Sequence, residues 1–198
     1  MQGLDESGAR ERVEKMARAH DEAIGAVLSQ AGSLLVVARL IVQAAAAGRK
    51  VMTCGNGGSA ADAQHLAAEL VGRFEDERMS LPCVALCVDP AVTTSLANDY
   101  GYESVFAQQV TALGRPGDLL ICFTTSGTSA NVVAAAREAR RLGVAVAAFV
   151  GAPGAAEELG GLTDVLVCCS SESTPRIQEA HGFAVHAVCD LVRALNSA

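Results

Sequence analysis

Five short apolar runs alternate with longer segments of helical composition, and this alternation restricts the possible folds more than any other feature of the chain. Within each run the apolar residues are continuous, which indicates strands buried on both faces, as in a parallel sheet. Strands separated by helices predict an α/β fold, here a doubly wound domain with a five-stranded parallel sheet flanked by helices. The expected strands are residues 51–54, 83–88, 119–123, 144–150 and 165–169.

Helices are expected between these strands and at both ends of the chain. Gly48 and the basic pair that follows it are typical of a helix C-terminus, so residues 1–48 are predicted to form N-terminal helices. We expect this helical segment to belong to the same domain as residues 49–198 and to serve oligomerisation. Residues 89–101 are assigned no helix, and residues 151–161 are expected to form a loop with at most one helical turn. The expected helices are residues 5–30, 33–47, 59–72, 103–113, 129–142 and 174–196.

Composition narrows the possible classes of protein. A chain of 198 residues with 51% hydrophobic and 19% charged residues is expected to fold as one domain rather than to be disordered. So apolar a chain with few large side chains indicates an oligomer that buries subunit surfaces. The net charge of −7 argues against a general nucleic-acid partner. The polar N-terminus and the lack of a long apolar run argue against a membrane partner.

Cysteine usage points to a reducing compartment. The seven cysteines are odd in number, include no C-x-x-C pair, and fall mostly in the apolar runs. Buried free thiols in a cytoplasmic protein explain this pattern, and a cysteine zinc site or catalytic thiol is the alternative.

Ligands of doubly wound sheets bind beyond the carboxyl ends of the strands, and the third run is followed there by a segment rich in hydroxyls. The segment TTSGTSAN (124–131) places hydroxyls around one glycine, and Ser129 is suited to cap the next helix. Such a loop at a helix N-terminus predicts a phosphate cradle, although a capped turn that binds nothing explains it equally well. Neither the dinucleotide fingerprint nor the P-loop pattern is present.

A second polar loop, GNGGSAADAQ, follows the first apolar run. Its glycines allow close approach of a ligand, and Ser59 is expected to cap the next helix with Asp62 three residues further on. On that helix His65 and Glu69 lie four residues apart and so share one face. A surface His–Glu pair without function is the competing interpretation.

The C-terminal helical segment supplies further candidate ligands. Gln178 and His186 are separated by about 80° around a helix, whereas His181 and His186 are separated by about 140° and cannot easily face one site. A lone histidine in an apolar stretch is often a core residue. If His186 instead meets His65 and Glu69, two histidines, a glutamate and a glutamine could hold zinc or a similar divalent metal.

Four motifs, GNGGSAADAQHLAAELVGRF, NDYGYESVFAQQV, TSGTSANV and TPRIQEAH, together resemble the phosphoheptose isomerases of the sugar isomerase (SIS) family. The resemblance runs from about residue 50 to 190. It implies that residues 49–198 form a SIS domain and that the protein is a cytoplasmic homotetramer with sites between subunits. It also implies an aldose–ketose isomerase that converts sedoheptulose 7-phosphate to D-glycero-D-manno-heptose 7-phosphate, the first step of ADP- or GDP-heptose biosynthesis.

The resemblance also assigns roles to individual residues. Glu69 falls on the general base and His186 on the general acid. The zinc ligands seen in some members fall on His65, Glu69, Gln178 and His186, which implies one zinc per subunit. Positions that contact the sugar phosphate fall on Asn56, Gly57, Ser59, Arg73, Asp99, Thr124, Thr125, Ser126, Ser129 and Gln178. Thr124 is a departure, because many members carry serine there; its hydroxyl still donates, and its methyl group tightens the pocket.

The chemistry agrees with these roles, since isomerisation through an enediol needs a base at carbon, an acid at the carbonyl oxygen and charge stabilisation. Three alternatives stay open. The first is a non-catalytic SIS protein that binds a replication initiator or another protein, although such a relative departs at the catalytic carboxylate. The second, a sugar-phosphate-sensing regulatory domain, lacks its DNA-binding module here. The third is a metal-free isomerase in which His65 and Gln178 only orient the substrate.

Overall fold

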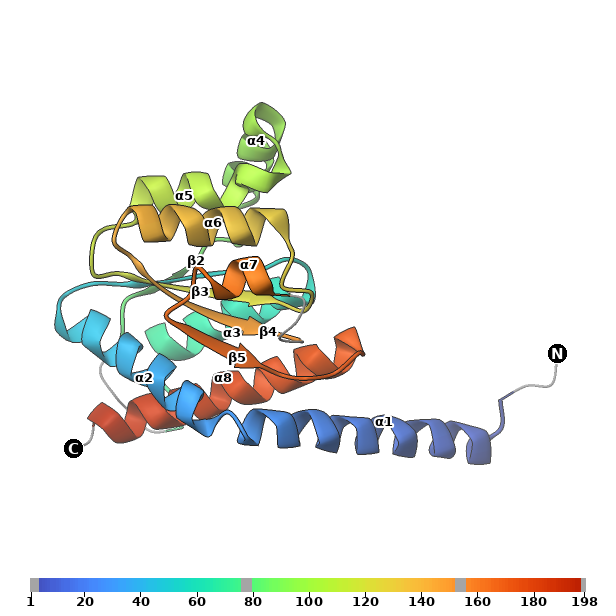
Figure 1. Ribbon diagram of the computed structural model, residues 1–198. Coiled ribbons are helices and arrows are strands. Elements are labelled where there is room, and N and C mark those ends of the chain that lie inside the picture. Colours follow the sequence, from blue (N-terminus) through green and yellow to red (C-terminus); the bar gives the residue numbers. More distant parts are fainter. Residues whose placement is uncertain (1–3, 76–79, 152–155, 197–198) are drawn as a thin grey trace.

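The computed structural model describes residues 4–75, 80–151 and 156–196, and it confirms the predicted fold: one parallel sheet of five strands lies between two layers of helices (Figure 1). The strands are β1 (Val51–Cys54), β2 (Cys83–Ala85), β3 (Leu119–Thr124), β4 (Ala145–Val150) and β5 (Val165–Cys168). The helices are α1 (Glu6–Leu28), α2 (Ala31–Ala46), α3 (Gly58–Val71), α4 (Pro90–Tyr100), α5 (Val105–Leu113), α6 (Ala130–Arg141), α7 (Glu157–Gly160) and α8 (Thr174–Asn196), with a 3₁₀ turn η1 at Tyr102–Ser104.

The sheet order is β2-β1-β3-β4-β5, and each neighbouring pair is parallel. The chain runs from β1 outward to β2 and then returns to β3 on the other side of β1. The order therefore reverses between β1 and β3, where Cys54 is paired with Cys122. Such a reversal opens a crevice at the carboxyl ends of the two strands, so the glycine loop after β1 and the hydroxyl loop after β3 become neighbours.

The two faces of the sheet have separate cores. On one face, α1, α2, α3 and α8 cover a cluster in which Phe123 and Phe149 stack with ring centroids 4.8 Å apart (Figure 1). On the other face, α5, α6 and α7 cover a cluster that includes Phe106 and Leu159. Both faces of β3 and nearly all of β4 are buried, which is why these strands read as continuous apolar runs in the sequence.

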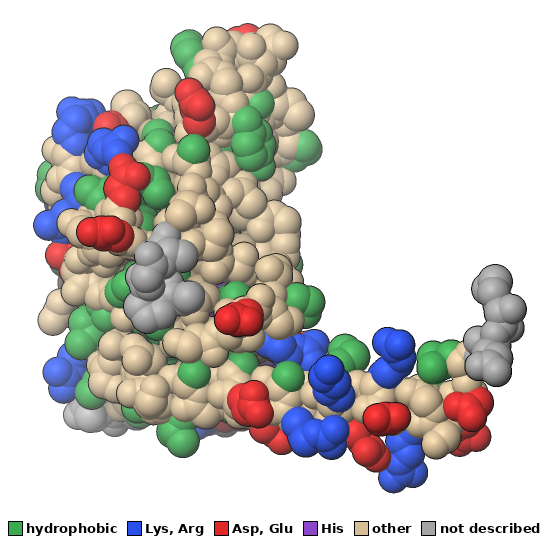
Figure 2. All heavy atoms as spheres, turned by 45° about the vertical axis from the view of Figure 1, so that its right-hand side comes forward, with side chains coloured by type: hydrophobic (Ala, Val, Ile, Leu, Met, Phe, Trp, Pro, Cys, Tyr) green, Lys and Arg blue, Asp and Glu red, His purple; other side chains and the backbone are tan. Residues whose placement is uncertain are grey.

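Helix α1 extends beyond the body of the molecule as an arm (Figures 1 and 2). Its middle is fastened to α8: Arg176 Nη1 donates to the carbonyl of Met16 at 2.8 Å, and His20 Nδ1 lies 2.9 Å from Glu179 Oε2. Among the described residues no single helix is long and apolar enough to span a membrane. The pair α1 and α2, bent by 64°, meets that criterion only jointly and by length and composition alone.

One helix of the structure was missed in the sequence. Residues 90–100 were assigned no helix, but they form α4, in which Asp89 Oδ1 accepts from the amides of Ala91 and Val92 and Pro90 occupies the first turn. None of the residues of α4 is buried. The helix therefore has no apolar stripe to reveal it, and only its N-terminal Asp-Pro signal marks it.

Other boundaries differ by small amounts. Strand β2 ends at Ala85 rather than at residue 88, because the chain turns there and the amide of Leu86 donates to the carbonyl of Thr53 at 2.8 Å. The helix expected at 103–113 begins as the 3₁₀ turn η1 before α5. In the segment predicted as a loop, residues 152–155 lie outside the described residues, and α7 is the single helical turn that was expected.

All seven cysteines are free, as the sequence predicted. Burial raises the pKa of Cys83 and of Cys169 to about 12, so both remain thiols at neutral pH. A thiolate is the form that attacks a substrate or binds a metal, and these two side chains are therefore packing groups.

Candidate active site

Helices α3 and α8 bring together three side chains that we call the outer cluster: His65, Glu69 and His186. His65 Nε2 lies 3.0 Å from His186 Nε2 and 3.5 Å from Glu69 Oε1. His65 and Glu69 sit one turn apart on α3, as their spacing predicted, and His186 reaches them from the neighbouring helix. Residues 121 positions apart in the chain thus converge at one point on the surface.

The outer cluster is open to solvent. The side chains of His65 and Glu69 are 37% and 25% exposed, and His186 is exposed. The ring of Phe74 lies beside His186 with centroids 5.9 Å apart, which gives the cluster one apolar wall. Side chains of this kind are accessible to a substrate, unlike the residues of the adjacent core.

The outer cluster fits a divalent metal by its donor set and by its spacing. Its ligand atoms all lie within 4.8 Å of one another. Tetrahedral zinc with bonds of about 2.0–2.1 Å holds its ligand atoms about 3.3 Å apart, close to the two contacts of His65 given above. Imidazole and carboxylate are ordinary zinc ligands. His65, Glu69 and His186 could therefore hold such an ion without rearrangement of α3 and α8.

Gln178 of α8 lies against the start of α3. A Cβ added at Gly58 would come within 2.2 Å of Gln178 Nε2, so the amide occupies the space that any larger residue would need. The structure therefore places Gln178 beside the glycine turn.

The glycine turn before α3 departs from one prediction. Ser59 was expected to cap this helix, but the helix begins at Gly58 and its N-cap is Gly57, whose φ of +55° favours glycine. Ser59 is instead inside the first turn and buried. The prediction was wrong because Gly57 can adopt a backbone conformation that starts the helix one residue earlier without a side-chain cap.

The hydroxyl loop after β3 is ordered by its own side chains. Thr124 Oγ1 lies 3.1 Å from Ser129 Oγ and accepts from the amide of Gly127 at 3.2 Å. Ser126 Oγ accepts from the amide of Thr128 at 3.2 Å. Ser129 is the N-cap residue of α6, as predicted, although its hydroxyl faces Thr124 rather than the helix amides. The amides of Val132 and Val133 donate to the carbonyl of Ser129, whereas those of Ala130 and Asn131 have no partner within the described residues and are available to an anion.

The glycine loop and the hydroxyl loop are tied to each other. Asn56 Nδ2 donates to Asn131 Oδ1 at 2.8 Å, and Asn131 Nδ2 donates back to Asn56 Oδ1 at 2.9 Å. The hydroxyl of Tyr102 also donates to Asn56 Oδ1, at 3.0 Å. Asn131 and Tyr102 were not singled out in the sequence, because an asparagine in a first helical turn and a tyrosine after a glycine carry no local signal of such pairing.

Two further predicted site residues, Asp99 and Arg73, lie exposed on the surface of the chain. Asp99 lies exposed on α4, on the side of the sheet opposite α3 and α8, and accepts from the amide group of Asn98 at 2.8 Å (Figure 1). Arg73 lies exposed just after α3, with Nη1 3.5 Å from the carbonyl of Glu75.

Behind the outer cluster the same two helices form a second contact, which we call the inner pair: Asp62 of α3 and His181 of α8. His181 Nδ1 lies 3.8 Å from Asp62 Oδ2, and within the described residues neither atom has a hydrogen-bond partner. His181 is fully buried and its ring meets those of Phe123 and Phe149 edge-on. Burial raises the pKa of Asp62 to about 6 and lowers the pKa of His181 to about 4.

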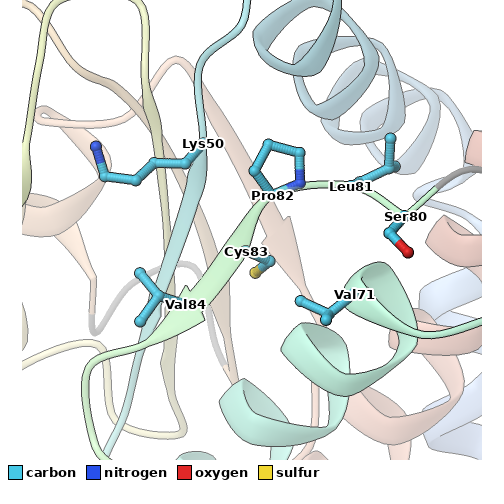
Figure 3. A pocket seen from close by; sticks show the side chains of 7 residues that line it. All are labelled: Lys50, Val71, Ser80, Leu81, Pro82, Cys83 and Val84. Carbon is cyan, nitrogen blue, oxygen red and sulfur yellow. The ribbon is translucent and has the colours of Figure 1, made fainter.

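A cavity of about 400 Å³ lies away from both loops (Figure 3). Its lining comes from the start of β2 and the end of α3, with Lys50 just before β1. It therefore sits at the amino ends of the strands, opposite the edge where ligands of such sheets bind. The ammonium of Lys50 is held by Asp118 Oδ2 at 2.5 Å, and Figure 3 shows it directed away from Ser80. This cavity offers few free polar groups and does not overlap the candidate site.

The comparisons with known proteins agree with this geometry. The family model described as "SIS domain" matches residues 11–151. A phosphoheptose isomerase of Roseiflexus sp. (strain RS-1) is 50% identical over 164 residues, which cover 83% of this chain and 82% of the relative. A phosphoheptose isomerase of Akkermansia muciniphila is 47% identical over 167 residues, or 84% of this chain and 87% of the relative.

A solved structure shows the same arrangement of elements. The phosphoheptose isomerase of Neisseria gonorrhoeae superimposes with a TM-score of 0.86 at 38% sequence identity. The match covers 94% of this chain and 99% of that one. The likeness therefore includes both the sheet and the helices that carry the outer cluster.

Proposed function

Because this chain belongs to the SIS domain family and, within it, to the phosphoheptose isomerases, we propose that it interconverts sedoheptulose 7-phosphate and D-glycero-D-manno-heptose 7-phosphate. The observation that carries the proposal is the convergence of His65, Glu69 and His186 at one point of the surface. The reaction needs a carbon base and an acid for the carbonyl oxygen, and a carboxylate and an imidazole at one point supply both.

The phosphate end of the substrate is assigned to the hydroxyl loop and the start of α6. The hydroxyls of Thr124, Thr125, Ser126 and Ser129, with Ser59 and Gly57 of the neighbouring turn, are suited to bind an oxyanion, and the helix N-terminus adds a favourable field. The binding energy of the phosphate then positions the reacting carbons at the other end. We assign Asn56 and Gln178 to the sugar between these ends, and Arg73 and Asp99 to substrate contacts in the assembled protein.

Proton transfer is assigned to the outer cluster. Glu69 removes a proton from carbon 1 of the ketose while His186 donates a proton to the oxygen of carbon 2, which gives the enediol. Glu69 then returns its proton to carbon 2, and His186 accepts the proton of the hydroxyl on carbon 1 as the aldehyde forms. Each residue ends in the protonation state in which it began, so the cycle needs no outside proton.

We propose zinc as the cofactor, one ion per subunit, held by His65, Glu69, Gln178 and His186. The support is the donor set and spacing of the outer cluster. When bound, the ion would polarise the substrate carbonyl and stabilise negative charge on its oxygen. Glu69 has two carboxylate oxygens, so one can bind a cation while the other exchanges a proton.

We propose that the protein is a cytoplasmic homotetramer with sites between subunits, in which residues 1–48 serve association around the SIS domain of residues 49–198. The arm formed by α1 supports this, because Val13 and Met16 are 64% and 53% exposed on it and Phe183 of α8 is 43% exposed. Apolar side chains on a projecting helix are suited to burial against another subunit. Asp99, distant from the outer cluster in one chain, would then complete a site of a neighbouring subunit.

The alternative of a non-catalytic protein that binds a replication initiator is not favoured. The relatives compared above carry the name of an isomerase, and Glu69 is present in the outer cluster.

The test is conversion of sedoheptulose 7-phosphate by the purified protein and by Glu69→Gln. The wild type is expected to form the aldose, and the variant is expected to bind the sugar phosphate with similar affinity and to lack turnover. Equal turnover by both proteins would refute the role of Glu69. No turnover by a folded wild-type protein supplied with zinc would refute the proposed function.

A further inference from the structure

The hydrogen bonds around Asn56 leave its amide with one free group. Asn56 Oδ1 accepts two hydrogen bonds, from Tyr102 and from Asn131, which matches its two lone pairs. Asn56 Nδ2 carries two hydrogens, and one of them is donated to Asn131 Oδ1. Within the part of the chain that the structure describes, one N–H of Asn56 therefore has no partner, and its direction is fixed by the three contacts.

The partners of Asn56 come from separate parts of the fold. Asn56 belongs to the glycine loop after β1, and Asn131, only 3% exposed, lies in the first turn of α6 directly after the hydroxyl loop. Tyr102 lies on η1, between α4 and α5. The reciprocal amide pair therefore fixes the glycine loop against the hydroxyl loop, and Tyr102 ties α4 to both.

We propose that Tyr102 and Asn131 are positioning residues for substrate binding, which act through Asn56. They fix the position of the glycine loop relative to the hydroxyl loop. They also orient the remaining N–H of Asn56 toward an oxygen of the bound sugar phosphate. This inference rests on the proposed function for the identity of the substrate. It adds two residues to the site and connects the site to α4, which carries Asp99.

The chain offers a matched pair of tyrosines for the test. Tyr102 and Tyr100 are 56% and 61% exposed, so loss of either hydroxyl leaves the core untouched. Only the hydroxyl of Tyr102 makes a hydrogen bond within the described residues. Tyr102→Phe therefore removes the contact to Asn56, and Tyr100→Phe is the control for loss of a tyrosine hydroxyl in the same segment.

The experiment is a double-mutant cycle on steady-state kinetics with sedoheptulose 7-phosphate. We expect Tyr102→Phe to raise KM about threefold to tenfold, with a smaller change in kcat, because one neutral hydrogen bond that orients a binding group is lost. Tyr100→Phe is expected to match the wild type. In an Asn56→Ala background, Tyr102→Phe is expected to change KM by less than about twofold, because the group it orients is gone.

Two results would overturn the proposal. If Tyr102→Phe raises KM by the same factor with and without Asn56, Tyr102 contacts the substrate itself and does not act through Asn56. If Tyr102→Phe behaves like Tyr100→Phe, the hydrogen bond has no role in binding.

Asn131→Asp tests the other partner of Asn56, because a carboxylate cannot donate to Asn56 Oδ1. A wild-type KM in that folded variant would also overturn the proposal. If the buried carboxylate prevents Asn131→Asp from folding, the double-mutant cycle of Tyr102 and Asn56 alone tests the proposal.

Binding of inorganic phosphate separates this inference from the proposed function. The dissociation constant of phosphate, measured by calorimetry for the same proteins, does not depend on turnover. Weaker phosphate binding in Tyr102→Phe than in Tyr100→Phe supports the positioning role even if the wild type fails to isomerise the heptulose. Equal phosphate binding together with equal KM in these two variants refutes it, whether or not the wild type is active.

Discussion

Helices α3 and α8 touch through two sets of histidine and carboxylate side chains that differ chiefly in burial. In the inner pair the side chain of His181 is fully buried and that of Asp62 is 13% exposed, and burial shifts the pKa of each group in the direction that favours its neutral form. In the outer cluster, His65, Glu69 and His186 face solvent with their ligand atoms converging. The same chemical groups on the same two helices therefore differ in their access to solvent, and only the exposed set is placed where a substrate could reach it.

The contact between α3 and α8 contributes both to the core and to the exposed outer cluster. His181 and His186 lie on different sides of α8, and the first packs against Phe123 and Phe149 while the second reaches His65. The buried contact lies within the core that fixes α3 against α8. The exposed cluster is therefore carried by two helices whose relative position is set by core packing, which is the kind of support that a precise site needs.

The largest expected effect is loss of catalysis from the outer cluster. We expect His186→Gln to lower kcat with sedoheptulose 7-phosphate by about 10²–10⁴-fold, because the acid at the carbonyl oxygen is removed. Rapid-mixing or coupled assays of kcat check this, with the melting temperature as the control for folding. A variant with near wild-type kcat would show that the outer cluster does not supply the acid.

The next effect concerns metal affinity. His65→Ala removes one of the four proposed zinc ligands, so the dissociation constant of zinc should rise by more than the about 10–100-fold that loss of an outer-shell partner costs. Titration calorimetry with zinc alone measures this without reference to turnover. His20→Ala is the control, since His20 pairs with Glu179 on another part of α8. If the two variants bind zinc equally well, the ion is held elsewhere.

The inner pair should appear in the pH dependence of stability. The folded pKa of Asp62 is raised to about 6 from 3.8, so its ionisation lowers the free energy of unfolding as pH rises between these values. The folded pKa of His181 is lowered to about 4 from 6.5, so its protonation lowers the free energy of unfolding as pH falls between these values. In the wild type the two contributions have opposite slopes and largely cancel between about pH 4 and 6.

Replacing one member of the inner pair should reveal the pH dependence of the free energy of unfolding that the other member causes. Asp62→Asn leaves His181, and the free energy of unfolding should then fall by about 2–3 kcal/mol as pH drops through this window. His181→Gln leaves Asp62, and it should fall by about 1–2 kcal/mol as pH rises, a smaller change because Asp62 is partly screened by solvent. Urea unfolding across the pH range, relative to the wild-type profile, measures both. Parallel slopes in the two variants would contradict the account.

The smallest effect is expected at a third histidine–carboxylate contact, between His20 and Glu179. These side chains are 42% and 39% exposed, so solvent screens their interaction. His20→Gln removes this contact and leaves the pair of Glu179 with the buried Arg176 in place, so it should lower the free energy of unfolding by less than about 1 kcal/mol at pH 6. Urea unfolding at low and high salt checks this value. A loss larger than that of either inner-pair variant would show that exposure does not rank these contacts as proposed.

The sequence predicted the layers of this fold because continuous apolar runs and amphipathic helices depend on local pattern. It placed His65 and Glu69 on one face of α3, and separated His181 from His186 on α8, because both follow from helix geometry. It missed α4, whose residues are all at least partly exposed, and it placed the N-cap of α3 at Ser59, two residues after the observed N-cap Gly57. Helices without an apolar stripe and glycine caps leave little periodic signal.

Contacts between distant segments could not be predicted from the sequence for a different reason. Asn56, Asn131 and Tyr102 meet only after β1 and β3 are paired and η1 has folded over them. The inner pair likewise depends on how α3 crosses α8. Such pairings are set by tertiary packing, and no spacing along the chain encodes them.

The central claim, that the outer cluster is a metal-assisted acid–base site, is tested most directly by one activity measurement. Turnover of sedoheptulose 7-phosphate is followed in the purified wild type, after treatment with chelator, and after zinc is restored. The account predicts activity that chelation abolishes and zinc recovers. Activity indifferent to chelator would contradict the metal site, and a folded protein inactive with zinc would contradict the isomerase assignment itself.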